Sequence, residues 1–342
     1  MVTNPISVGL VGAGYWGRKL LSKFLLAPDC SVKIVCDLHA SLRSYVNQNF
    51  PGIQTTDSYE EALDDADIRA LVLATPPATH FSLAKKTIEA GKHVWVEKPL
   101  AMSFAEGSLL VRLAQARRTI LFVDHTFLYD PFTGLIRDLI KKGELGDIYH
   151  LYFQRLNLGR VKRDSNVWWN SAPHDVSLLL YLLEAQPKSI TLRGYDYLQH
   201  KIEDLTMAAI EMSDGASAFI YHNWLYPEST AKLTVIGTKK LLTYEGKFTN
   251  RNASVYEYTV EKCATPNREL PTTIPSQITR QYKLEDVLDE EPLAIAISDF
   301  LGSIREGRAP LSDGNFSLRV LAVLEAGEES LRSGGAKIVP KI

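Results

Sequence analysis

The stretch ISVGLVGAGYWG, residues 6–17, decides the fold of the first part of the chain, because it joins an apolar run directly to a glycine-rich turn. The apolar run, residues 6–11, predicts a buried strand. The residues from Tyr15 to Leu26 predict a helix that ends near Pro28. A strand, a GxGxxG turn and a helix in this order are typical of a dinucleotide site; the alternative is a glycine-rich turn without a ligand.

Each glycine of the turn has a physical role in such a site. Gly12 permits the tight turn, Gly14 lets the backbone approach a pyrophosphate, and Gly17 lets the helix and the strand pack closely. Tyr15 and Trp16 open the helix, whose N-terminal N–H groups and positive dipole end attract phosphates. The sequence therefore predicts that a nucleotide cofactor binds across residues 12–17.

An acidic residue stands where the second strand, residues 31–36, is expected to end. Asp37 lies 20 positions after Gly17, which is where an acid hydrogen bonds to the ribose 2′-hydroxyl of NAD. A carboxylate repels the 2′-phosphate of NADP, so NAD is the favoured cofactor and NADP the less favoured one. Two alternatives stay open: Arg43 lies nearby and could reach a phosphate, and Asp37 could be a plain loop acid.

The order of the expected elements predicts two domains. Within residues 1–124, apolar strands alternate with amphipathic helices, which is the pattern of a parallel sheet covered on both faces. After residue 124, β-rich segments follow one another with short turns such as Asp214-Gly215, which predict an antiparallel sheet. One helix, from about His174 to Glu184, interrupts these segments, and two more, about 292–306 and 315–333, close the chain.

We therefore expect an α/β fold built from an NAD-binding Rossmann domain and an α+β domain. The first, residues 1–124, has a doubly wound parallel sheet. The second, residues 125–342, has an open, mainly antiparallel sheet and serves substrate binding and oligomerisation. The helix 315–333 is placed so that it can pack back on the first domain.

The composition excludes several classes of protein. The 342 residues carry 38 Lys and Arg against 40 Asp and Glu, and a net charge of −2 argues against a nucleic-acid binder. No run of about 18 apolar residues predicts a membrane span, and the first residues lack the charged start of a signal peptide. The three cysteines, Cys30, Cys36 and Cys263, match no metal pattern. We expect reduced thiols, a cytoplasmic location and no metal site.

Two further motifs follow apolar strands of the first domain. The segment ATPPATH, residues 74–80, contains Thr75, Pro76 and His80, and EKP, residues 97–99, contains Glu97 and Lys98. Ligands of open α/β sheets bind at the carboxyl ends of parallel strands, so both motifs are candidates for the site. A lysine beside a nicotinamide and a substrate hydroxyl is suited to proton transfer. The alternatives are a solvated surface lysine and, for His80, a structural loop histidine.

Together, GxGxxG, the acid after the second strand, TPPxxH, and EKP followed by a β-rich domain resemble the Gfo/Idh/MocA family of NAD(P)-dependent oxidoreductases. The resemblance covers essentially the whole chain, including the LIKKGELGDI segment at 139–148. It implies that Lys98 is the catalytic lysine, that Glu97 and Pro99 complete its motif, and that the cofactor lies across Gly12 to Gly17.

The resemblance also implies a second catalytic element, an Asp and a His four residues apart at the start of a helix. In this chain the matching stretch is WWNSAPHD, residues 168–175, in which His174 takes the histidine position and Asn170 the aspartate position. The exchange is a departure, because an amide can orient an imidazole but cannot stabilise an imidazolium as a carboxylate does. Asp175 is expected to be a cap or a structural acid.

Weaker candidates for substrate contact lie in the second domain. Trp168 is either a wall of the nicotinamide pocket or a core residue, and Arg155 and Asn157 belong to a QRLNLGR segment that faces the expected cleft. A structural salt bridge is an equal alternative for Arg155. His125 and Tyr129 follow the last strand of the first domain and could approach the site.

These observations predict a dehydrogenase that exchanges a hydride between NAD and a secondary hydroxyl or ketone of a sugar. The WNxAPHD-like and QRLNLGR stretches resemble family members of polysaccharide precursor pathways, which favours a nucleotide-linked sugar. The alternatives are an NAD-binding sensor without turnover, which Asn170 favours, and an NAD-dependent glycosidase without net redox change. An exposed apolar sheet face usually marks an interface, and the resemblance implies that this face forms a homodimer or homotetramer.

Overall fold

The computed structural model describes residues 4–159, 161–247, 250–260, 273–274, 276–285 and 287–341. The chain divides into two compact units. The first unit comprises Met1–Asp130 and Glu290–Glu325, and the second comprises Pro131–Asp289 and Ala326–Lys341. No helix among the described residues is both long enough and apolar enough to cross a membrane.

The first unit contains a parallel sheet with the strand order β3-β2-β1-β4-β5-β6. The order runs outward from β1 in both directions, so the chain reverses its winding between β3 and β4. Right-handed crossovers then place α1 and α2 on one face and α4 and α5 on the other. This confirms the doubly wound parallel sheet. Its strands are β1 (Ile6–Val11), β2 (Cys30–Cys36), β3 (Gln54–Thr56), β4 (Ala70–Leu73), β5 (His93–Val96) and β6 (Leu121–Val123).

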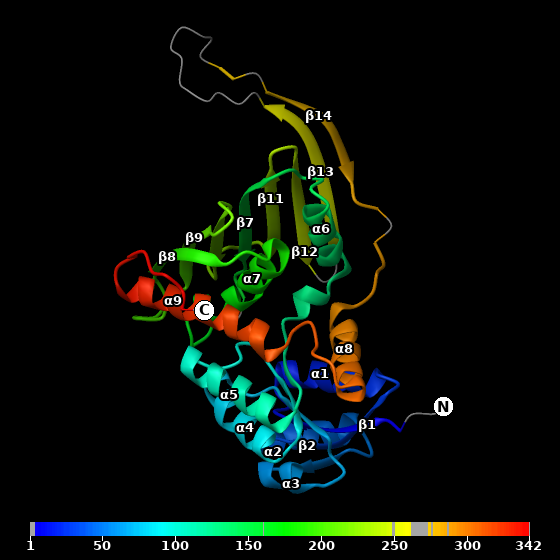
Figure 1. The fold of residues 1–342 in the computed structure, drawn as a ribbon. Coiled ribbons are helices and arrows are strands. Elements are labelled where there is room, and N and C mark those ends of the chain that lie inside the picture. The colour runs from blue at the N-terminus through cyan, green and yellow to red at the C-terminus, as the bar shows by residue number, and fades with distance from the viewer. Residues whose placement is uncertain are drawn as a thin grey trace. The chain divides into compact units, whose positions relative to one another are not determined.

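The helices of this unit alternate with the strands along the chain (Figure 1). They are α1 (Tyr15–Leu26), α2 (Ala40–Asn49), α3 (Tyr59–Asp64), α4 (Pro77–Glu89), α5 (Phe104–Arg117), the 3₁₀ helix η1 (Thr126–Tyr129), α8 (Pro292–Glu306) and the first part of α9 (Gly314–Arg332). Ser58 and Ser103 cap α3 and α5 by accepting backbone N–H groups, as short polar residues do at helix starts.

Aromatic side chains form the core that fixes β5 and β6. Trp95 is fully buried and stacks on Phe122 with ring centroids 4.1 Å apart. Phe24 of α1 and Phe300 of α8 meet the Trp95 ring edge-on, at 5.4 and 5.6 Å. Aromatic pairs of this geometry add to the stabilisation that burial alone provides. The strand ends that follow Val96 and Val123 are therefore held on a rigid base.

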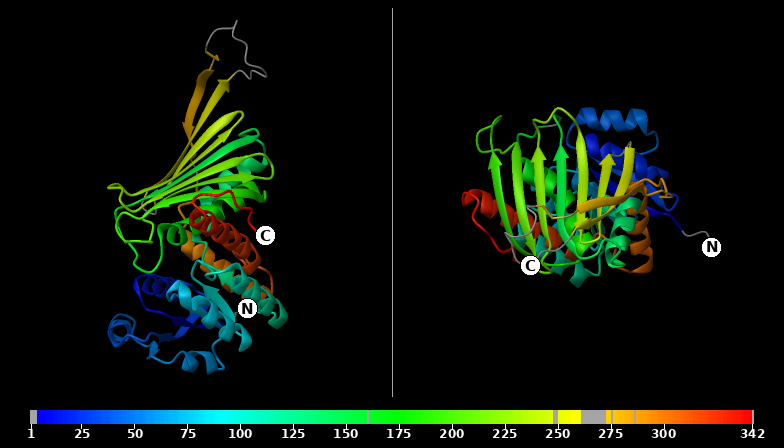
Figure 2. Two further views of the ribbon diagram at one scale, coloured as in Figure 1. Left: turned by 90° about the vertical axis from the view of Figure 1, so that its left-hand side faces the viewer. Right: turned by 90° about the horizontal axis from the view of Figure 1, so that it is seen from above.

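The second unit contains a sheet with the strand order β14-β13-β12-β11-β7-β10-β9-β8. Its pairings are antiparallel except that between β7 and β10, so the expected open, mainly antiparallel sheet is confirmed. Figure 2 shows the strands side by side. They are β7 (Ile148–Leu156), β8 (Pro187–Tyr195), β9 (Leu205–Met212), β10 (Ser217–Asn223), β11 (Thr230–Gly237), β12 (Lys240–Lys247), β13 (Asn250–Val260) and β14 (Ser276–Lys283).

Two helices, α6 (Pro131–Lys141) and α7 (Val167–Leu183), pack against this sheet. The side chains of β9 and β10 alternate between buried and more exposed, as strands covered on one face do. Ala208, Ile210 and Ile220 are buried, whereas Met207 and Phe219 are exposed on the opposite face. The second face of the sheet is therefore open in the single chain.

The structure differs from the sequence-based expectation at α7. This helix begins at Val167, seven residues before His174, where we expected it to begin. The side chain of Asn166 caps it by accepting the Trp169 N–H at 3.1 Å. Pro173 lies inside this helix. Because proline is normally disfavoured in the interior of a helix, the sequence pattern did not reveal the first two turns of α7.

Candidate functional site

The glycine turn between β1 and α1 has the geometry that a pyrophosphate requires. Gly12 has a φ of +96°, and a Cβ there would lie 2.6 Å from the carbonyl oxygen of Ala74. A Cβ on Gly17 would lie 1.8 Å from the Gly12 carbonyl oxygen, so only glycine allows this helix–strand contact. A Cβ on Gly14 would meet nothing within 4 Å, which leaves open space against the backbone. These observations fit a bound dinucleotide.

Asp37 follows β2 and is tied to the glycine turn. Its Oδ2 accepts the N–H of Ala13 at 2.7 Å, and its Oδ1 accepts the N–H of His39 at 2.9 Å. The carboxyl group is largely buried, with 8 % of the residue exposed. It is thus fixed beside the helix N-terminus, where a ribose hydroxyl could donate to its remaining lone pairs.

Arg43, which could in principle reach a phosphate, is engaged within this region. Its Nη1 donates to the carbonyl oxygens of Asp37 and Leu38 at 2.7 and 3.0 Å. Its Nη2 lies 3.2 Å from Oδ2 of Asp57. A 2′-phosphate here would meet the Asp37 carboxylate and a guanidinium that already has partners.

His80 joins the loop after β4 to the loop after β5. It is fully buried, with Nδ1 2.8 Å from the Pro99 carbonyl oxygen and Nε2 2.9 Å from that of Thr75. Burial lowers the pKa of the imidazole, and the two carbonyl groups oppose that shift. A neutral ring has one N–H, so it donates to one of these carbonyls at a time. Pro76 is exposed and begins the turn into α4, where the Thr79 hydroxyl donates to that of Thr75.

Lys98 is half-buried and is the second residue after β5, at the carboxyl edge of the parallel sheet. The Lys98–Pro99 peptide bond is cis. Glu97, its neighbour, accepts the indole N–H of Trp16 from the first turn of α1. The structure therefore brings the EKP segment and the glycine turn together within the first unit.

A second acid, Asp124, was not among the residues that the sequence analysis selected. It follows β6 as Glu97 follows β5, and its Oδ1 accepts the hydroxyl group of Thr126. The carboxyl groups of Glu97 and Asp124 lie close enough to influence each other's protonation. Burial, and then the nearby Asp124 charge, raises the pKa of Glu97 well above its ordinary range, and burial also raises the pKa of Asp124. An acid directly after an apolar strand was the available signal.

His125 and Tyr129 are both buried in the first unit. Neither ring nitrogen of His125 has a hydrogen-bond partner among the described residues. Burial, with the charge of Lys98, lowers the pKa of His125 to about 3, so its imidazole is neutral. The Tyr129 hydroxyl donates to Oδ2 of Asp299 at 2.7 Å, which links η1 to α8.

In the second unit, Asn170 and His174 lie one turn apart on α7 and are both half-buried. Residues at this spacing share one face of a helix. The arrangement of the amide and the imidazole that the resemblance implies is therefore present within this unit. Lys98 belongs to the first unit and this pair to the second.

Asp175 is the centre of a buried ionic network. Its Oδ1 accepts Nη2 of Arg155 at 2.8 Å, and its Oδ2 lies 2.8 Å from Nε2 of His222. Burial favours a higher pKa for Asp175, but Arg155 and His222 outweigh it and bring the pKa to about 2. Arg155 thus makes the structural salt bridge that was the alternative to substrate contact, and Asp175 is a structural acid.

The other two candidates of the second unit differ in exposure. Trp168 is fully buried, its ring centroid lies 6.2 Å from that of His222, and a Cβ on Gly327 would lie 2.5 Å from its ring. Trp168 is therefore a core residue, which was the alternative to a wall of the nicotinamide pocket. Asn157 is exposed just after β7, and its side chain lies against Gly159.

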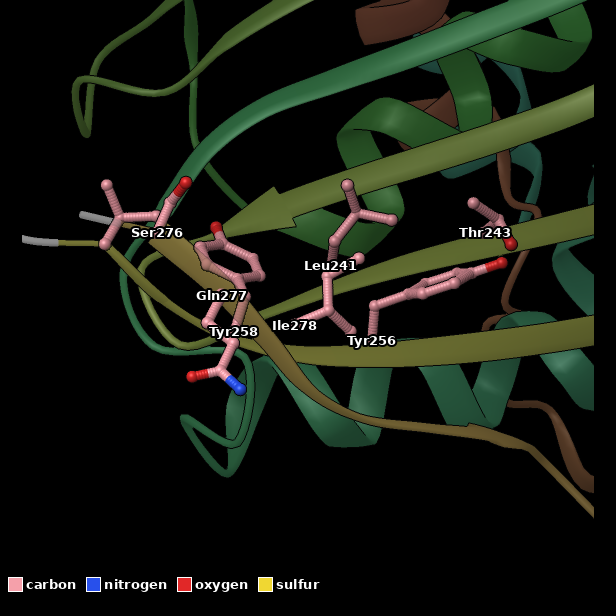
Figure 3. Close-up of a pocket in the computed structure, with 8 residues that line it drawn as sticks. Leu241, Thr243, Tyr256, Tyr258, Ser276, Gln277 and Ile278 are labelled. Carbon is pink, nitrogen blue, oxygen red and sulfur yellow. The ribbon is translucent and has the colours of Figure 1, made fainter. Parts of the chain in front are cut away.

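A separate hollow of about 530 Å³ lies on β12, β13 and β14 (Figure 3). Tyr256, Tyr258, Leu241 and Ile278 supply much of its lining, and the side chains in Figure 3 lie along the strands rather than around an enclosed cavity. The described lining includes none of the residues predicted for the site. It belongs to the sheet surface and not to the cofactor turn.

Comparisons with known proteins agree with both units. Residues 6–125 match the model of the oxidoreductase family with an NAD-binding Rossmann fold, GFO_IDH_MocA, and residues 134–243 match the GFO/IDH/MocA C-terminal domain. UDP-N-acetylglucosamine 3-dehydrogenase of Acidithiobacillus ferrooxidans is 24% identical over 321 residues, which are 92% of this chain and 93% of that protein.

Solved structures share the fold over nearly the whole chain. The WlbA dehydrogenase from Bordetella pertussis, in complex with NADH and UDP-GlcNAcA, has a TM-score of 0.82 at 22% identity, covering 100% of this chain and 99% of that one. Levoglucosan dehydrogenase, in complex with NADH and levoglucosan, has a TM-score of 0.83 at 17% identity, covering 99% and 100%. With matched models for both domains, the chain belongs to the Gfo/Idh/MocA family of oxidoreductases.

Proposed function

We propose that this protein is an NAD-dependent dehydrogenase that acts on a secondary hydroxyl group of a sugar. The observation that carries the proposal is the position of Lys98, at the carboxyl edge of the parallel sheet and in the same unit as a glycine turn that fits a dinucleotide. Sugar or nucleotide-sugar names recur among the relatives, in UDP-N-acetylglucosamine 3-dehydrogenase, WlbA and levoglucosan dehydrogenase.

One group of residues binds and orients the cofactor. Gly12, Gly14 and Gly17 with the N-terminus of α1 hold the pyrophosphate, and Asp37 holds the adenine ribose. Tyr15, Trp16, Thr75, Pro76, His80 and Glu97 complete the cofactor-binding side. When bound, NAD⁺ takes up the hydride that leaves the carbinol carbon. These groups bind and orient, and they do not exchange protons with the substrate.

Lys98 accepts or relays the proton of the reacting hydroxyl group, and His174 is its partner in that relay. Asn170, one turn before His174, orients the imidazole. Asn157 contacts the substrate, Arg155 is held in its salt bridge with Asp175, and Trp168 supports α7 from within the core. In the reverse direction Lys98 returns the proton to the oxygen of a ketone.

We further propose that the sugar is nucleotide-linked. The relatives with UDP-linked sugars in their names support this, and levoglucosan dehydrogenase supports a free sugar instead. A thermal-shift screen at saturating NADH, with UDP-, dTDP- and GDP-sugars beside free sugars and inositols, separates the two. A ligand at 100 times its Kd should stabilise the protein by about 2.7 kcal/mol. Stabilisation by free sugars alone would overturn the nucleotide-linked assignment.

Lys98→Ala tests the catalytic assignment. The variant should lower kcat by about 10²–10⁴-fold, the usual scale of general acid–base catalysis, while NADH binding stays near that of the wild type. NADH absorbance gives the rate and fluorescence titration gives the affinity. Lys86→Ala, at an exposed lysine of α4, is the matched control and should behave as the wild type. Near-normal turnover in Lys98→Ala would contradict the assignment.

Asn170 favours a second candidate function, an NAD-binding sensor without turnover. Net accumulation of NADH with a sugar from the screen would exclude the sensor, and would exclude a glycosidase without net redox change as well. Asn170→Asp adds a test of the sensor hypothesis. A gain in kcat of far more than about tenfold would indicate that the native site, with Asn170, is unsuited to turnover.

We also propose that copies of the chain associate through the open face of the sheet in the second unit. Phe219 and Met207 are exposed there, and the hollow at β12–β14 extends the apolar surface. Light scattering at micromolar concentration should find a dimer or a tetramer, and a monomer would contradict this. The cytoplasmic location stays a prediction.

A further inference from the structure

We propose that Glu97 and Asp124 form a buried acid pair that shares one proton, and that Asp124 is a positioning residue for the cofactor turn. The positioning role rests on the proposed function, because it assumes that NAD binds at this turn. The shared proton does not depend on it.

Strand register brings the two acids together. Val96 of β5 and Val123 of β6 are partners in a parallel pairing, and the Asp124 N–H donates to the Val96 carbonyl oxygen at 2.9 Å. The next residues along the two strands, Glu97 and Asp124, therefore leave the same edge of the sheet side by side. Their carboxyl groups lie close enough to influence each other's protonation.

The donors around the acid pair are too few for two carboxylates. The Trp16 indole N–H donates to Oε1 of Glu97, and the Thr126 hydroxyl donates to Oδ1 of Asp124. Among the described residues, no donor reaches the buried Oδ2 of Asp124 with hydrogen-bond geometry. Ionised carboxyl groups only accept hydrogen bonds, so the contact between them needs a proton on one of the two. One shared proton supplies that missing donor.

Burial makes the proton energetically necessary. Glu97 is 9 % exposed and Asp124 is 1 % exposed, and two unpaired charges at such depth are costly. Burial raises the pKa of both groups, and the charge of Asp124 raises that of Glu97 further. Two carboxyl groups that cannot both ionise titrate as one unit, so the proton belongs to the pair.

The charges on the surrounding elements match a single negative charge on the acid pair. Lys98 follows Glu97 on the chain, and its positive charge lowers the pKa of both acids. On α1, the Lys19 ammonium lies 5.4 Å from the Trp16 ring centroid. His125 and His80 carry imidazoles whose pKa burial lowers. With one shared proton, the acid pair has a single negative charge, which the positive charge of Lys98 balances. Without the proton, the acid pair would have two negative charges.

The acid pair links three segments that the cofactor needs. Trp16 belongs to the glycine turn and α1, Glu97 precedes Lys98, and Asp124 ends β6. Loss of the proton would place two carboxylates in contact, and their repulsion would loosen Glu97 from Trp16. Asp124 therefore acts through Glu97 and Trp16 on the turn, without touching the substrate.

Carboxyl-carbon NMR of the full-length chain tests the shared proton. Near neutral pH the wild type should retain one protonated carboxyl signal that is absent in both Asp124→Asn and Glu97→Gln, since each variant puts a permanent amide donor in place of the acid. Asp175→Asn is the matched control: it removes a buried but ionised carboxylate, so the protonated signal should persist. Absence of a protonated carboxyl signal in the wild type would overturn the shared proton.

NADH affinity as a function of pH, measured by fluorescence titration, tests the positioning role. Wild-type affinity should fall by about tenfold or more as the pH passes the point where the NMR titration shows the acid pair losing its proton. Asp124→Asn should bind NADH with a flat pH profile, because its amide cannot be deprotonated. A wild-type-like slope in Asp124→Asn, or a flat wild-type profile, would overturn the role.

The two measurements separate failure of this proposal from failure of the proposed function. A wild type that shows the shared proton but does not bind NADH would overturn the cofactor assignment and the positioning role, and would leave the acid pair standing. A wild type that binds and reduces NAD without a protonated carboxyl signal would overturn the acid pair and leave the dehydrogenase standing.

Discussion

The two units bury acids in different charge states. In the first unit, the acid pair of Glu97 and Asp124 has an indole, a hydroxyl and one nearby lysine around it, and burial raises the pKa of both groups. In the second unit, Asp175 lies between Arg155 and His222, and its pKa falls to about 2. Asp124 and Asp175 are 1 % and 3 % exposed, so depth alone does not explain the contrast.

The difference shows that donors, rather than burial, decide the charge of a buried acid. Arg155 offers Asp175 two N–H groups and a full positive charge, which compensate for the loss of water. The acid pair accepts hydrogen bonds from two neutral donors, the indole of Trp16 and the hydroxyl group of Thr126, so a retained proton costs less free energy than a second charge. The same residue type is thus a fixed anion in one unit and a proton carrier in the other.

Of the variants that test this comparison, Asp175→Ala should lower the free energy of unfolding the most. Removal of one partner of a buried ion pair leaves the other charge uncompensated and typically costs about 3–5 kcal/mol. Because Arg155 retains partial exposure, we expect the lower end of that range. Chemical denaturation followed by circular dichroism measures it, with Glu211→Ala, at an exposed salt bridge of the same sheet, as the control. A loss of stability below about 1 kcal/mol is typical of surface ion pairs. Such a result would show that Arg155 does not compensate the buried charge of Asp175 as described.

Asp124→Ala should be destabilising by a smaller amount. The variant strands Glu97 without its neighbour, and an unsatisfied buried polar group costs about 1–3 kcal/mol. Asp124→Asn keeps a donor at the same place and should remain within about 1 kcal/mol of the wild type. Equal losses in the two variants, measured by the same denaturation experiment, would mean that volume and not the hydrogen bond matters at this position.

The dependence of stability on pH should have opposite signs in the two units. Asp175 has a lowered pKa, so its stabilisation is present above its ordinary value of 3.8 and is lost as the pH falls toward about 2. That shift corresponds to about 2 kcal/mol. The acid pair has a raised pKa, so its stabilisation is full below the ordinary carboxyl range and is lost as the pH rises through the pKa of the pair.

Melting temperatures across the pH range check this assignment. Asp175→Asn should remove the loss on the acid side only, and Glu97→Gln should remove the loss on the alkaline side only. If either variant removes the loss of stability on both sides of the pH profile, Asp175 and the acid pair do not act independently and the comparison fails.

Local patterns predicted the parts of the candidate site that rest on neighbouring residues. The glycine turn and Asp37 follow their strands directly, and Lys98 is the second residue after β5, so periodicity and spacing were sufficient to find them. The helical face shared by Asn170 and His174 follows from their spacing in the same way.

Interactions that depend on strand order could not be predicted in this way. Glu97 meets Asp124 because β5 lies beside β6. Arg155 and His222 reach the same carboxylate because they are partners in the parallel pairing of β7 and β10. Contacts between residues 27 and 67 positions apart in sequence leave no local signal. Pro173 further concealed the start of α7.

The contacts of Arg43 bear on how cofactor preference can change over evolutionary time. Replacement of Asp37 by a small neutral residue removes the repulsion of a 2′-phosphate, yet Arg43 would still be held by the Leu38 carbonyl and by Asp57. A lineage that moved toward NADP would need a second change at Asp57 before the guanidinium could turn to the phosphate. Each substitution gains little without the other, so this epistasis makes NAD use resistant to drift by single mutations.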